Sequence, residues 1–553
     1  MIRATLVCST SRGARTSIDL ATLLDAPRRE EVHEETYQWI KQLRCVRYGT
    51  DSMRERFTYD GDSLWWFTEI YLHKTKRLER AVATVLALEH ALERFAPADL
   101  ELATAEATVA EAARRFAQAR HLPLTCTATH GRSRAAVRWS SFWTAMASQL
   151  SRVRRGAAFS PGPRARVAAF VHNAFWRTGS GDAAAGEAYI GPVLEALGAM
   201  LEPGELALVG VGPRRNFRAR RWWDPLTHGA APGPLVIPIE RLAPRAALTR
   251  STTLWRDRHA LASTVVSGEA IRAAGVRRGI DLWPILRGEL IETARLQWPW
   301  AARAMDEAGA SLDRLRPDAV VTYAEAGGWG RALVVEARRR GIPSGGLQHG
   351  FIYRHWLNYR HEPDELRPIG TDAGCPIPDR TLVFDGGAER QLLDGGRFPA
   401  GRLAVVGSPR LDELAARVRT LERQRSKLRT SLGVQPDQQL AVLAAKFVEV
   451  HGELPSLGEA IRHLPQTRLI VKTHPAETTA AYAGLTAASA RVTVAPPDAD
   501  LATLIVSADV IVTMNSTVAV DAMVLGIPTV VLGLPNNLSP FVDAGAMAGA
   551  GRA

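Results

Sequence analysis

The chain contains little cysteine. Its 553 residues include four cysteines, which lie far apart and form no CxxC pair: Cys8, Cys45, Cys126 and Cys375. This spacing argues against a disulfide framework and against a cysteine-based zinc site. It is typical of a protein from a reducing cytoplasm.

Long apolar runs are also missing. The first residues, "MIRATLVCSTSRG", contain too short an apolar run for a signal peptide, and no stretch approaches the ~18 uncharged apolar residues of a membrane span. Even the most apolar region, residues 501–535, contains Asp509, Asn515 and Asp521. We therefore expect a cytoplasmic protein that neither crosses the membrane nor is secreted by the usual route.

Lysine is rare, although the chain is basic. Only six of the 69 basic residues are lysines, and the formal net charge is +12. A basic chain suits a polyanionic partner, but no aromatic-studded basic groove or zinc-finger spacing accompanies the arginines, which argues against nucleic acid. An arginine-favouring composition with solvated helix faces is the simpler interpretation. A phosphate ligand, or a peripheral position at the inner face of the cell membrane, is the alternative.

Strand and helix patterns alternate along the chain, which predicts an α/β fold with parallel sheets. The length exceeds what one hydrophobic core usually supports, so several domains are expected. We predict an N-terminal α/β region over 1–155, without an assignable motif. A Rossmann-like domain over 160–368 and a second over 378–553 are expected to follow. A basic stretch at 148–166 and the polar, proline-containing segment 362–379 are interpreted as boundaries.

Two of the six lysines follow strand patterns of the third region. Lys446 ends "AVLAAK", and Lys472 and His474 lie in "LIVKTHP". The carboxyl ends of parallel strands share one edge of a sheet, where ligands bind and helix amino ends point. Lysine at such an edge suits a phosphate, and proline after the histidine stiffens the turn. A strand-ending turn with a solvated histidine is the plainer alternative.

A second group of polar residues follows the strand pattern "DVIVT". Asn515, Ser516 and Thr517 precede a short helix pattern that stops at Gly526. Hydroxyls and free amides at a helix start form a generic anion site, although Ser516 could serve only as a helix cap. No GxxxxGK[ST] sequence occurs, so the phosphate ligands would act without a P-loop.

These motifs resemble a known group of enzymes. The order "QHG" (348–350), "KTHP" (472–475) and "NST" (515–517) is similar to the GT-B glycosyltransferases of bacterial surface-glycan synthesis. That group includes capsule polysaccharide transferases, CDP-glycerol glycerophosphotransferases and bacterial polysialyltransferases. The stretch "VVGSPRLDEL" (405–414) also resembles a turn of these proteins and of UDP-N-acetylglucosamine 2-epimerases. The resemblance covers roughly residues 318–540.

The resemblance implies a GT-B-like transferase with two Rossmann-like domains facing a cleft. It implies that His474, Ser516 and Thr517 contact the phosphates of a nucleotide-sugar or CDP-activated donor, with a glycan or lipid-linked acceptor between the halves. Neither a metal nor a cofactor is then required. The "DAD" at 498–500 precedes a helix pattern, where aspartate is the expected cap, rather than forming a metal site.

The acceptor half offers candidates at its own strand ends. Glu325 follows "AVVTYA", His349 ends "SGGLQ", and His172 and Asn173 end "VAAFV". A carboxylate with a raised pKa, or a neutral histidine, can deprotonate an acceptor hydroxyl, so Glu325 and His349 are the catalytic candidates. A helix-capping glutamate or a histidine bonded to a carbonyl would be structural instead.

Other functions stay open at this stage. Asp521 stands where the epimerases typically have glutamate, and their serine-glycine-glycine turn is absent, so epimerase chemistry ranks second. A non-catalytic nucleotide-sugar-binding homologue, or a structural partner of a membrane polysaccharide machine, is the third class. GT-B proteins usually finish with a helical stretch, whereas this sequence ends in "GAMAGAGRA", so we expect a truncated C-terminal domain.

Overall fold

The computed structural model describes residues 2–11, 13–73, 76–128, 164–173, 176–177, 186–187, 189–212, 236–323, 325–473, 477, 479–496, 499–534 and 536–550. By its internal contacts the chain divides into two units, residues 1–188 with 197–405 and residues 189–196 with 406–553. We call these unit 1 and unit 2 and describe each by itself. No helix in the described ranges is both long and apolar enough to span a membrane.

A seven-stranded parallel sheet forms the base of unit 1, in the order β13-β12-β9-β16-β17-β18-β19. Its strands are β9 (Val167–His172), β12 (Leu206–Val211), β13 (Val236–Pro238), β16 (Ala319–Tyr323), β17 (Ser344–Leu347), β18 (Arg380–Val383) and β19 (Leu403–Val405). The neighbouring strands β9, β12 and β16 are short, mainly apolar runs, as expected for strands covered on both faces, whereas β17 and β18 contain glycine or polar residues. Val320, Leu312 of α12 (Trp298–Leu315) and Leu333 of α13 (Gly328–Arg339) share one buried cluster.

The position of β18 and β19 differs from the expected domain boundary. Both strands pair in parallel within this sheet, β18 with β17 and β19 with β18. The chain leaves unit 1 between Val405 and Val406 instead of near residue 378. The polar segment 362–379, interpreted as a boundary, therefore lies inside unit 1.

The N-terminal region contributes a four-stranded sheet in the order β2-β1-β7-β8. Its elements are β1 (Thr5–Ser9), β2 (Arg15–Asp19), α1 (Ala26–Leu43), α3 (Arg77–Phe95), β7 (Asp99–Thr104), α4 (Ala107–Ala119) and β8 (Leu124–Ala128). The pair β7 and β8 is parallel, whereas β1 runs antiparallel to β2 and to β7. Most of the basic stretch 148–166 lies outside the described residues.

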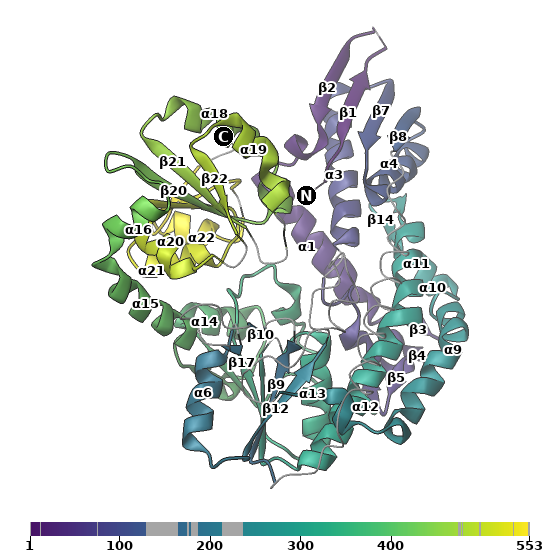
Figure 1. Cartoon of the computed structure of the whole chain (residues 1–553). Coiled ribbons are helices and arrows are strands. Elements are labelled where there is room, and N and C mark those ends of the chain that lie inside the picture. Colours follow the sequence, from purple (N-terminus) through teal and green to yellow (C-terminus); the bar gives the residue numbers. More distant parts are fainter. Residues whose placement is uncertain are drawn as a thin grey trace. The chain divides into compact units, whose positions relative to one another are not determined.

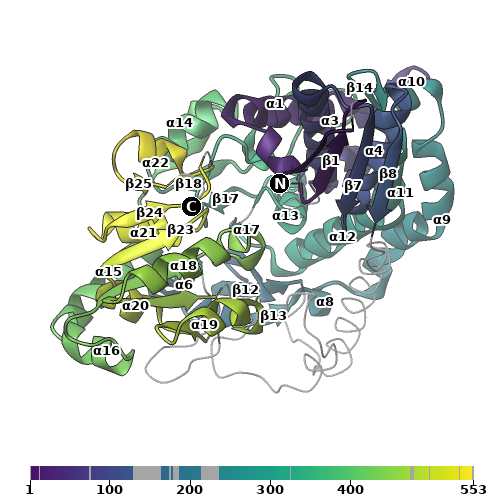
Figure 2. The ribbon, with the colours of Figure 1, turned by 90° about the horizontal axis from the view of Figure 1, so that it is seen from above.

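The described residues of the N-terminal region share their hydrophobic core with helices from later in the chain. Trp39, Trp65 and Trp66 share one cluster of buried residues with Trp298 of α12 and with several other helices. Those helices are α9 (Thr249–Val265), α10 (Glu269–Ala273) and α11 (Trp283–Glu292). The hairpin of β14 (Val276–Arg277) and β15 (Ile280–Asp281) connects α10 to α11. In both views α9, α10 and α11 lie side by side (Figures 1 and 2).

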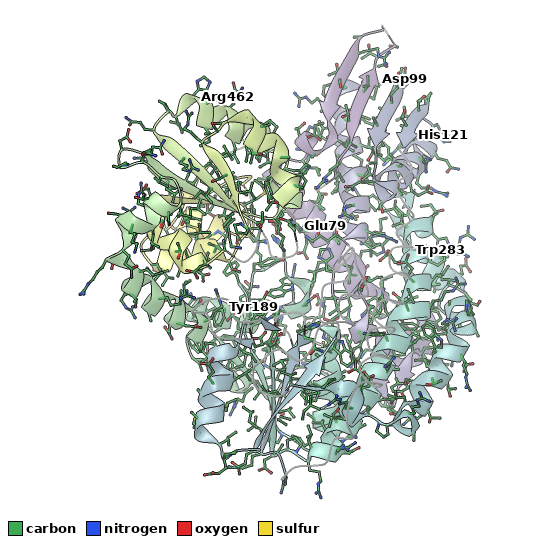
Figure 3. The ribbon with its side chains drawn as sticks, viewed as in Figure 1. Glu79, Asp99, His121, Tyr189, Trp283 and Arg462 are labelled. Carbon is green, nitrogen blue, oxygen red and sulfur yellow. The ribbon has the colours of Figure 1, made fainter. Side chains whose placement is uncertain are left out.

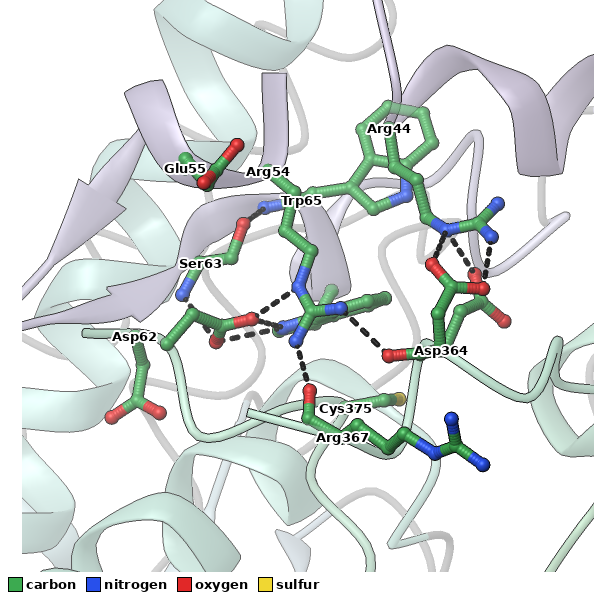
Figure 4. A network of polar contacts seen from close by, with 12 residues as sticks. Arg44, Arg54, Glu55, Asp62, Ser63, Trp65, Asp364, Arg367 and Cys375 are labelled. Carbon is green, nitrogen blue, oxygen red and sulfur yellow. Dashed lines mark hydrogen bonds and ion pairs between the residues drawn. The ribbon is translucent and has the colours of Figure 1, made fainter. Parts of the chain in front are cut away.

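Buried charges join the N-terminal region to segment 362–379. Lys41 Nζ lies 2.7 Å from Glu365 Oε2, and both side chains are almost fully buried. Arg54 Nε lies 2.6 Å from Asp372 Oδ2, while Asp372 Oδ1 accepts from the indole N–H of Trp66 at 3.1 Å. Figure 4 shows Arg54 reaching into this segment. Because a buried charge is costly unless it is paired and hydrogen-bonded, these contacts fix the segment to the N-terminal core.

Unit 2 is built on a six-stranded parallel sheet in the order β22-β21-β20-β23-β24-β25. Its strands are β20 (Gln439–Ala444), β21 (Thr467–Lys472), β22 (Val492–Ala495), β23 (Val510–Thr513), β24 (Thr529–Val531) and β25 (Ala548–Gly549). Alternate residues of β20 face opposite sides of the sheet. Leu443 packs on the side of α18 (Leu454–His463) and α19 (Ala483–Ala488). Val442 packs on the side of α20 (Leu501–Ser507) and α21 (Val518–Val524). Figure 1 shows these helix pairs on the two faces. The predicted α/β class with two Rossmann-like sheets and an extra N-terminal α/β region is confirmed.

Candidate functional site

The candidate phosphate ligands of unit 2 follow three neighbouring strands. Ala444 of β20 pairs with Lys472 of β21 on one side and with Thr513 of β23 on the other, so these strands end at the same level. Lys446 comes two residues after β20 and is exposed. Asn515, Ser516 and Thr517 follow β23. These residues therefore share the carboxyl edge of one sheet, whereas His474 lies outside the described residues.

Local hydrogen bonds explain the shape of the turn after β23. Thr513 Oγ1 donates to the carbonyl of Ala444 at 2.7 Å and accepts from the amide of Ser516 at 3.2 Å. Ser516 Oγ accepts from the amide of Val518 at 3.3 Å, and Thr517 occupies the cap position with no side-chain cap bond. Asn515 Oδ1 accepts from the amide of Asn537 at 3.3 Å. The hydroxyl of Thr513, which the sequence analysis overlooked, thus ties this turn to β20.

A carboxylate already occupies part of this edge. The amide of Phe447, the first residue of α17 (Phe447–Val450), donates to Glu477 Oε1 at 2.9 Å. Tyr482 Oη donates to the carbonyl of Ala445 at 3.1 Å and lies 3.3 Å from Glu477 Oε2. Lys472 Nζ donates to the carbonyl of Thr473 at 3.2 Å. Glu477 and Tyr482 therefore hold the loop that contains Lys446, a connection that spacing in the sequence does not reveal.

An ion pair joins the "GSPR" turn to the helix after "NST". Arg410, in the first turn of α15 (Pro409–Glu422), places Nη2 2.7 and 2.9 Å from the two carboxylate oxygens of Asp521. Asp521 lies on α21 and is buried. Burial raises the pKa of Asp521, and Arg410 only partly offsets this effect. Two motifs that the sequence analysis singled out separately are thus bonded to each other.

In unit 1 the candidates also follow neighbouring strands. His172 and Asn173 follow β9, and β16, which precedes Glu325, lies between β9 and β17, which precedes His349. Tyr323, the last residue of β16, connects them: its hydroxyl accepts from the amide of His172 at 3.0 Å, and its ring lies 5.6 Å from the ring of His349. The expectation that these residues share one sheet edge agrees with this pairing.

Asn173 is fixed by the neighbouring strand end. Its Nδ2 donates to the carbonyl of Gly212 at 2.7 Å. A Cβ at Gly210 would come within 2.3 Å of Asn173 Oδ1, and a Cβ at Gly212, which has φ of +72°, would come within 2.5 Å of the His172 ring. The two glycines therefore leave the space that His172 and Asn173 occupy.

Glu325 is a buried carboxyl group with one described partner. The side chain is 2% exposed, and Tyr359 Oη donates to Oε1 at 2.9 Å. Oε2 has no hydrogen-bond partner among the described residues. Burial raises the pKa of Glu325 to about 7, although its own amide, Tyr359 and Arg331 favour the charged form. A Cβ at Gly346 would come within 3.0 Å of the Glu325 side chain, so glycine is needed there.

His349 is half-buried among aromatic rings. Its ring lies 6.2 Å from that of Trp356, which in turn lies 4.9 Å from the ring of Tyr359. Burial lowers the pKa of His349 to about 4, so the imidazole is neutral at physiological pH. The aromatic segment "FIYRHWLNYR" (351–360) was not among the predicted site residues. Its dense aromatic content directly after "QHG" is the signal that could have identified it.

The described residues contain no cluster of three or more histidine, cysteine or carboxylate side chains able to hold a metal ion. Asp500 accepts from the amide of Thr503 at 2.9 Å and caps α20, as expected for this part of the "DAD" sequence. Asp498 lies outside the described residues. Independence from metal stays a prediction.

The C-terminal part of the chain matches a known protein family. Residues 416–537 match the family described as capsule polysaccharide biosynthesis protein. The resemblance to capsule-synthesis proteins is confirmed. This capsule-synthesis segment includes β20, β21 and β23 and therefore every described phosphate-ligand candidate. No curated protein matches the chain.

Several solved structures are similar to parts of the chain. UDP-GlcNAc 2-epimerase from Neisseria meningitidis, bound to UDP-GlcNAc, is 15% identical over 45% of this chain and 68% of its own, with a TM-score of 0.34. The Methanocaldococcus jannaschii UDP-GlcNAc 2-epimerase is 14% identical over 70% and 89%, with a TM-score of 0.40. Acinetobacter baumannii MurG is 18% identical over 46% and 66%, with a TM-score of 0.29. At these identities the comparison concerns the fold alone.

Proposed function

We propose that the chain is a GT-B-type transferase that moves a glycosyl or glycerophosphoryl group from a nucleotide-activated donor to a surface-glycan acceptor. The observation that carries the proposal is the coincidence of two findings in unit 2. The capsule-synthesis segment, residues 416–537, contains the sheet edge at which Lys446, Lys472 and Ser516 lie. A glycosyl-handling enzyme that uses an activated sugar needs cationic and hydroxyl groups for the donor phosphates, and this edge supplies them.

Each group at the edge of unit 2 has a distinct role in this proposal. Lys446 and Lys472 offset the charge of the donor phosphates, and the Ser516 and Thr517 hydroxyls donate to phosphate oxygens. His474, by resemblance, stabilises the phosphate that leaves with the nucleotide. These groups compensate the negative charge without a divalent metal.

The proton is removed from the acceptor by unit 1. Glu325, whose pKa is raised to about 7, has the basicity suited to a general base near neutral pH. His349 is the more exposed of the two and is better placed to contact an acceptor, but burial makes it a weak base. His172 and Asn173 would orient the acceptor hydroxyl through their positions after β9.

The first experiment measures nucleotide binding without needing the acceptor. Melting curves with CMP, CDP, UDP or GDP, in the presence of chelator, should show stabilisation by one of them, since a ligand of the native state raises its stability. Ser516→Ala and Lys472→Ala should then weaken its binding about 10- to 150-fold each, the range for a lost charge-assisted hydrogen bond. Lys427→Ala, at an exposed lysine of α16 (Arg425–Ser431), is the matched control.

The second experiment separates binding from catalysis. With the nucleotide identified, Glu325→Gln and His349→Ala should leave its affinity nearly unchanged, while loss of the true base lowers transfer about 10²–10⁴-fold. Binding that needs magnesium would refute the metal-free mechanism. Isomerisation of the sugar nucleotide without any acceptor would refute transfer and favour the epimerase-like alternative.

A further inference from the structure

Unit 1 carries an exposed arginine-rich region that the proposed transfer reaction does not use. Between residues 241 and 300 there are ten arginines, no lysine and five carboxylates, and four of the fourteen tryptophans of the chain. Of those carboxylates, Glu289 is fully buried beside Arg77 and contributes nothing to the surface charge. The helices α9, α10 and α11 carry five of these arginines and four of the carboxylates, one of which is the buried Glu289.

Two shallow hollows adjoin on this region. The first, of about 400 Å³, is lined by Arg47, Arg56 and the turn between α9 and α10, among others. The second, of about 450 Å³, is lined by Val266, Gly268, Glu269, Arg272, Trp283 and Arg287. Gly268 and Glu269 belong to both. Arg47 and Arg56 lie 3.9 and 3.8 Å from the carboxylates of Glu55 and Asp51. We therefore call Arg272, Trp283 and Arg287 the arginine–tryptophan face.

The arginines of the second hollow are not used to hold the fold. Arg272 and Arg287 are exposed, and no ion pair or side-chain hydrogen bond joins either guanidinium group to another described residue. In contrast, the nearby Arg278 lies 2.9 Å from Glu31 and 2.7 Å from Glu89 and fixes the hairpin to α1 and α3. The charge of Arg272 and Arg287 is therefore free to meet an external anion.

Apolar groups lie beside these arginines. Trp283, labelled in Figure 3, begins α11, lines the second hollow and is half-buried. Gly275 packs on it so closely that a Cβ there would come within 2.8 Å of the Trp283 backbone. The next residue, Val276, is 46% exposed. Arginine next to tryptophan and an exposed aliphatic residue is the combination that binds the interface of a bilayer, where cations meet phosphates and indole rings lie at headgroup level.

We propose that the arginine–tryptophan face docks unit 1 on an anionic lipid bilayer. Arg272 and Arg287 pair with lipid phosphates, and Trp283 with Val276 enters the headgroup region. An anionic soluble polymer would also attract the arginines, but it offers no apolar layer for Val276. This inference concerns binding alone and does not depend on the proposed transfer reaction.

Vesicle flotation with the full chain tests the proposal. The protein should float with vesicles of phosphatidylcholine and phosphatidylglycerol but not with phosphatidylcholine alone. Each basic residue near an anionic surface contributes about fivefold to partitioning, so Arg272→Ala/Arg287→Ala should lower it about thirtyfold. Trp283→Ala should also weaken binding. Near-ultraviolet circular dichroism and melting curves identify any variant that fails to fold. If Trp283→Ala does not fold, the result of the exposed pair Arg272→Ala/Arg287→Ala decides the test.

A matched double variant controls for net charge. Arg419→Ala/Arg423→Ala removes the same charge from exposed positions of unit 2 and should leave vesicle binding unchanged. Equal losses in both double variants would overturn the proposal, because net charge alone would then explain binding. Unchanged flotation of the Arg272/Arg287 variant would overturn it too. If the protein bound dextran sulfate but did not float with the anionic vesicles, the proposal would also be overturned, and the face would be interpreted as a site for a soluble polyanion.

Discussion

The protonation of Glu325 should make the stability of unit 1 depend on pH in an unusual direction. Burial raises the pKa of this carboxyl group from 4.5 to about 7. Between these values the native state binds a proton that the unfolded chain has released, so the free energy of unfolding falls as pH rises. A shift of this size corresponds to about 3 kcal/mol, which is present below pH ~4.5 and lost on passing pH ~7.

Glu325→Gln removes this titration with little change of shape. A glutamine Oε1 can still accept the hydrogen bond from Tyr359, and its amide replaces the protonated oxygen at Oε2. We expect the variant to match the wild type near pH 5 and to exceed it by up to about 3 kcal/mol near pH 8. Urea unfolding at both pH values, followed by tryptophan fluorescence, measures the difference.

Tyr359→Phe is the informative companion variant. The hydroxyl of Tyr359 favours the charged form of Glu325, so its loss should raise the pKa further and move the fall in stability to higher pH. A stability difference between Glu325→Gln and the wild type that stays constant from pH 5 to pH 8 would refute the reasoning. It would mean that Glu325 titrates at an ordinary pKa despite its burial.

Three further outcomes are expected. Lys41→Met should lower the free energy of unfolding by about 3–5 kcal/mol, because it removes the ammonium group that lies 2.7 Å from the buried carboxylate of Glu365. Lys41→Met/Glu365→Gln should recover much of this loss in denaturant titrations. Arg410→Ala should destabilise unit 2 by about 2 kcal/mol, whereas the pair Arg410→Ala/Asp521→Asn should cost less, since no buried charge remains. Gly346→Ala should displace Glu325, which would be seen as a loss of the pH-dependent fall in stability.

The alternation of strands and helices was predictable because it depends on local patterns. The parallel strands β20 and β21 have apolar interiors, and a lysine ends β21 or follows β20 by two residues. The carboxyl edge of their sheet follows from the parallel topology. This rule predicted Lys472, and together with the helix start that follows β23 and the family resemblance it predicted Ser516. The predicted domain boundary near residue 378 was wrong, because a segment rich in Asp, Glu and Pro has the composition of a solvated linker.

The missing information in that segment is long-range. Glu365 and Asp372 are buried because Lys41 and Arg54, more than 300 residues away in the chain, supply the opposite charges. Pairing at this separation leaves no periodic trace in the sequence. The same limit applies to Tyr359 with Glu325 and to Arg410 with Asp521, whose partners could not be matched before the fold was known.

The two sheet edges differ in charge, and this difference supports the division of roles in the proposed reaction. Burial keeps Glu325 protonated below pH ~7 and His349 neutral above pH ~4, so neither candidate of unit 1 carries a charge across that interval. At the edge of unit 2, Lys446 is exposed and Lys472 is half-buried, so both keep contact with water. An uncharged edge suits the neutral hydroxyl of an acceptor, whereas a cationic edge suits donor phosphates.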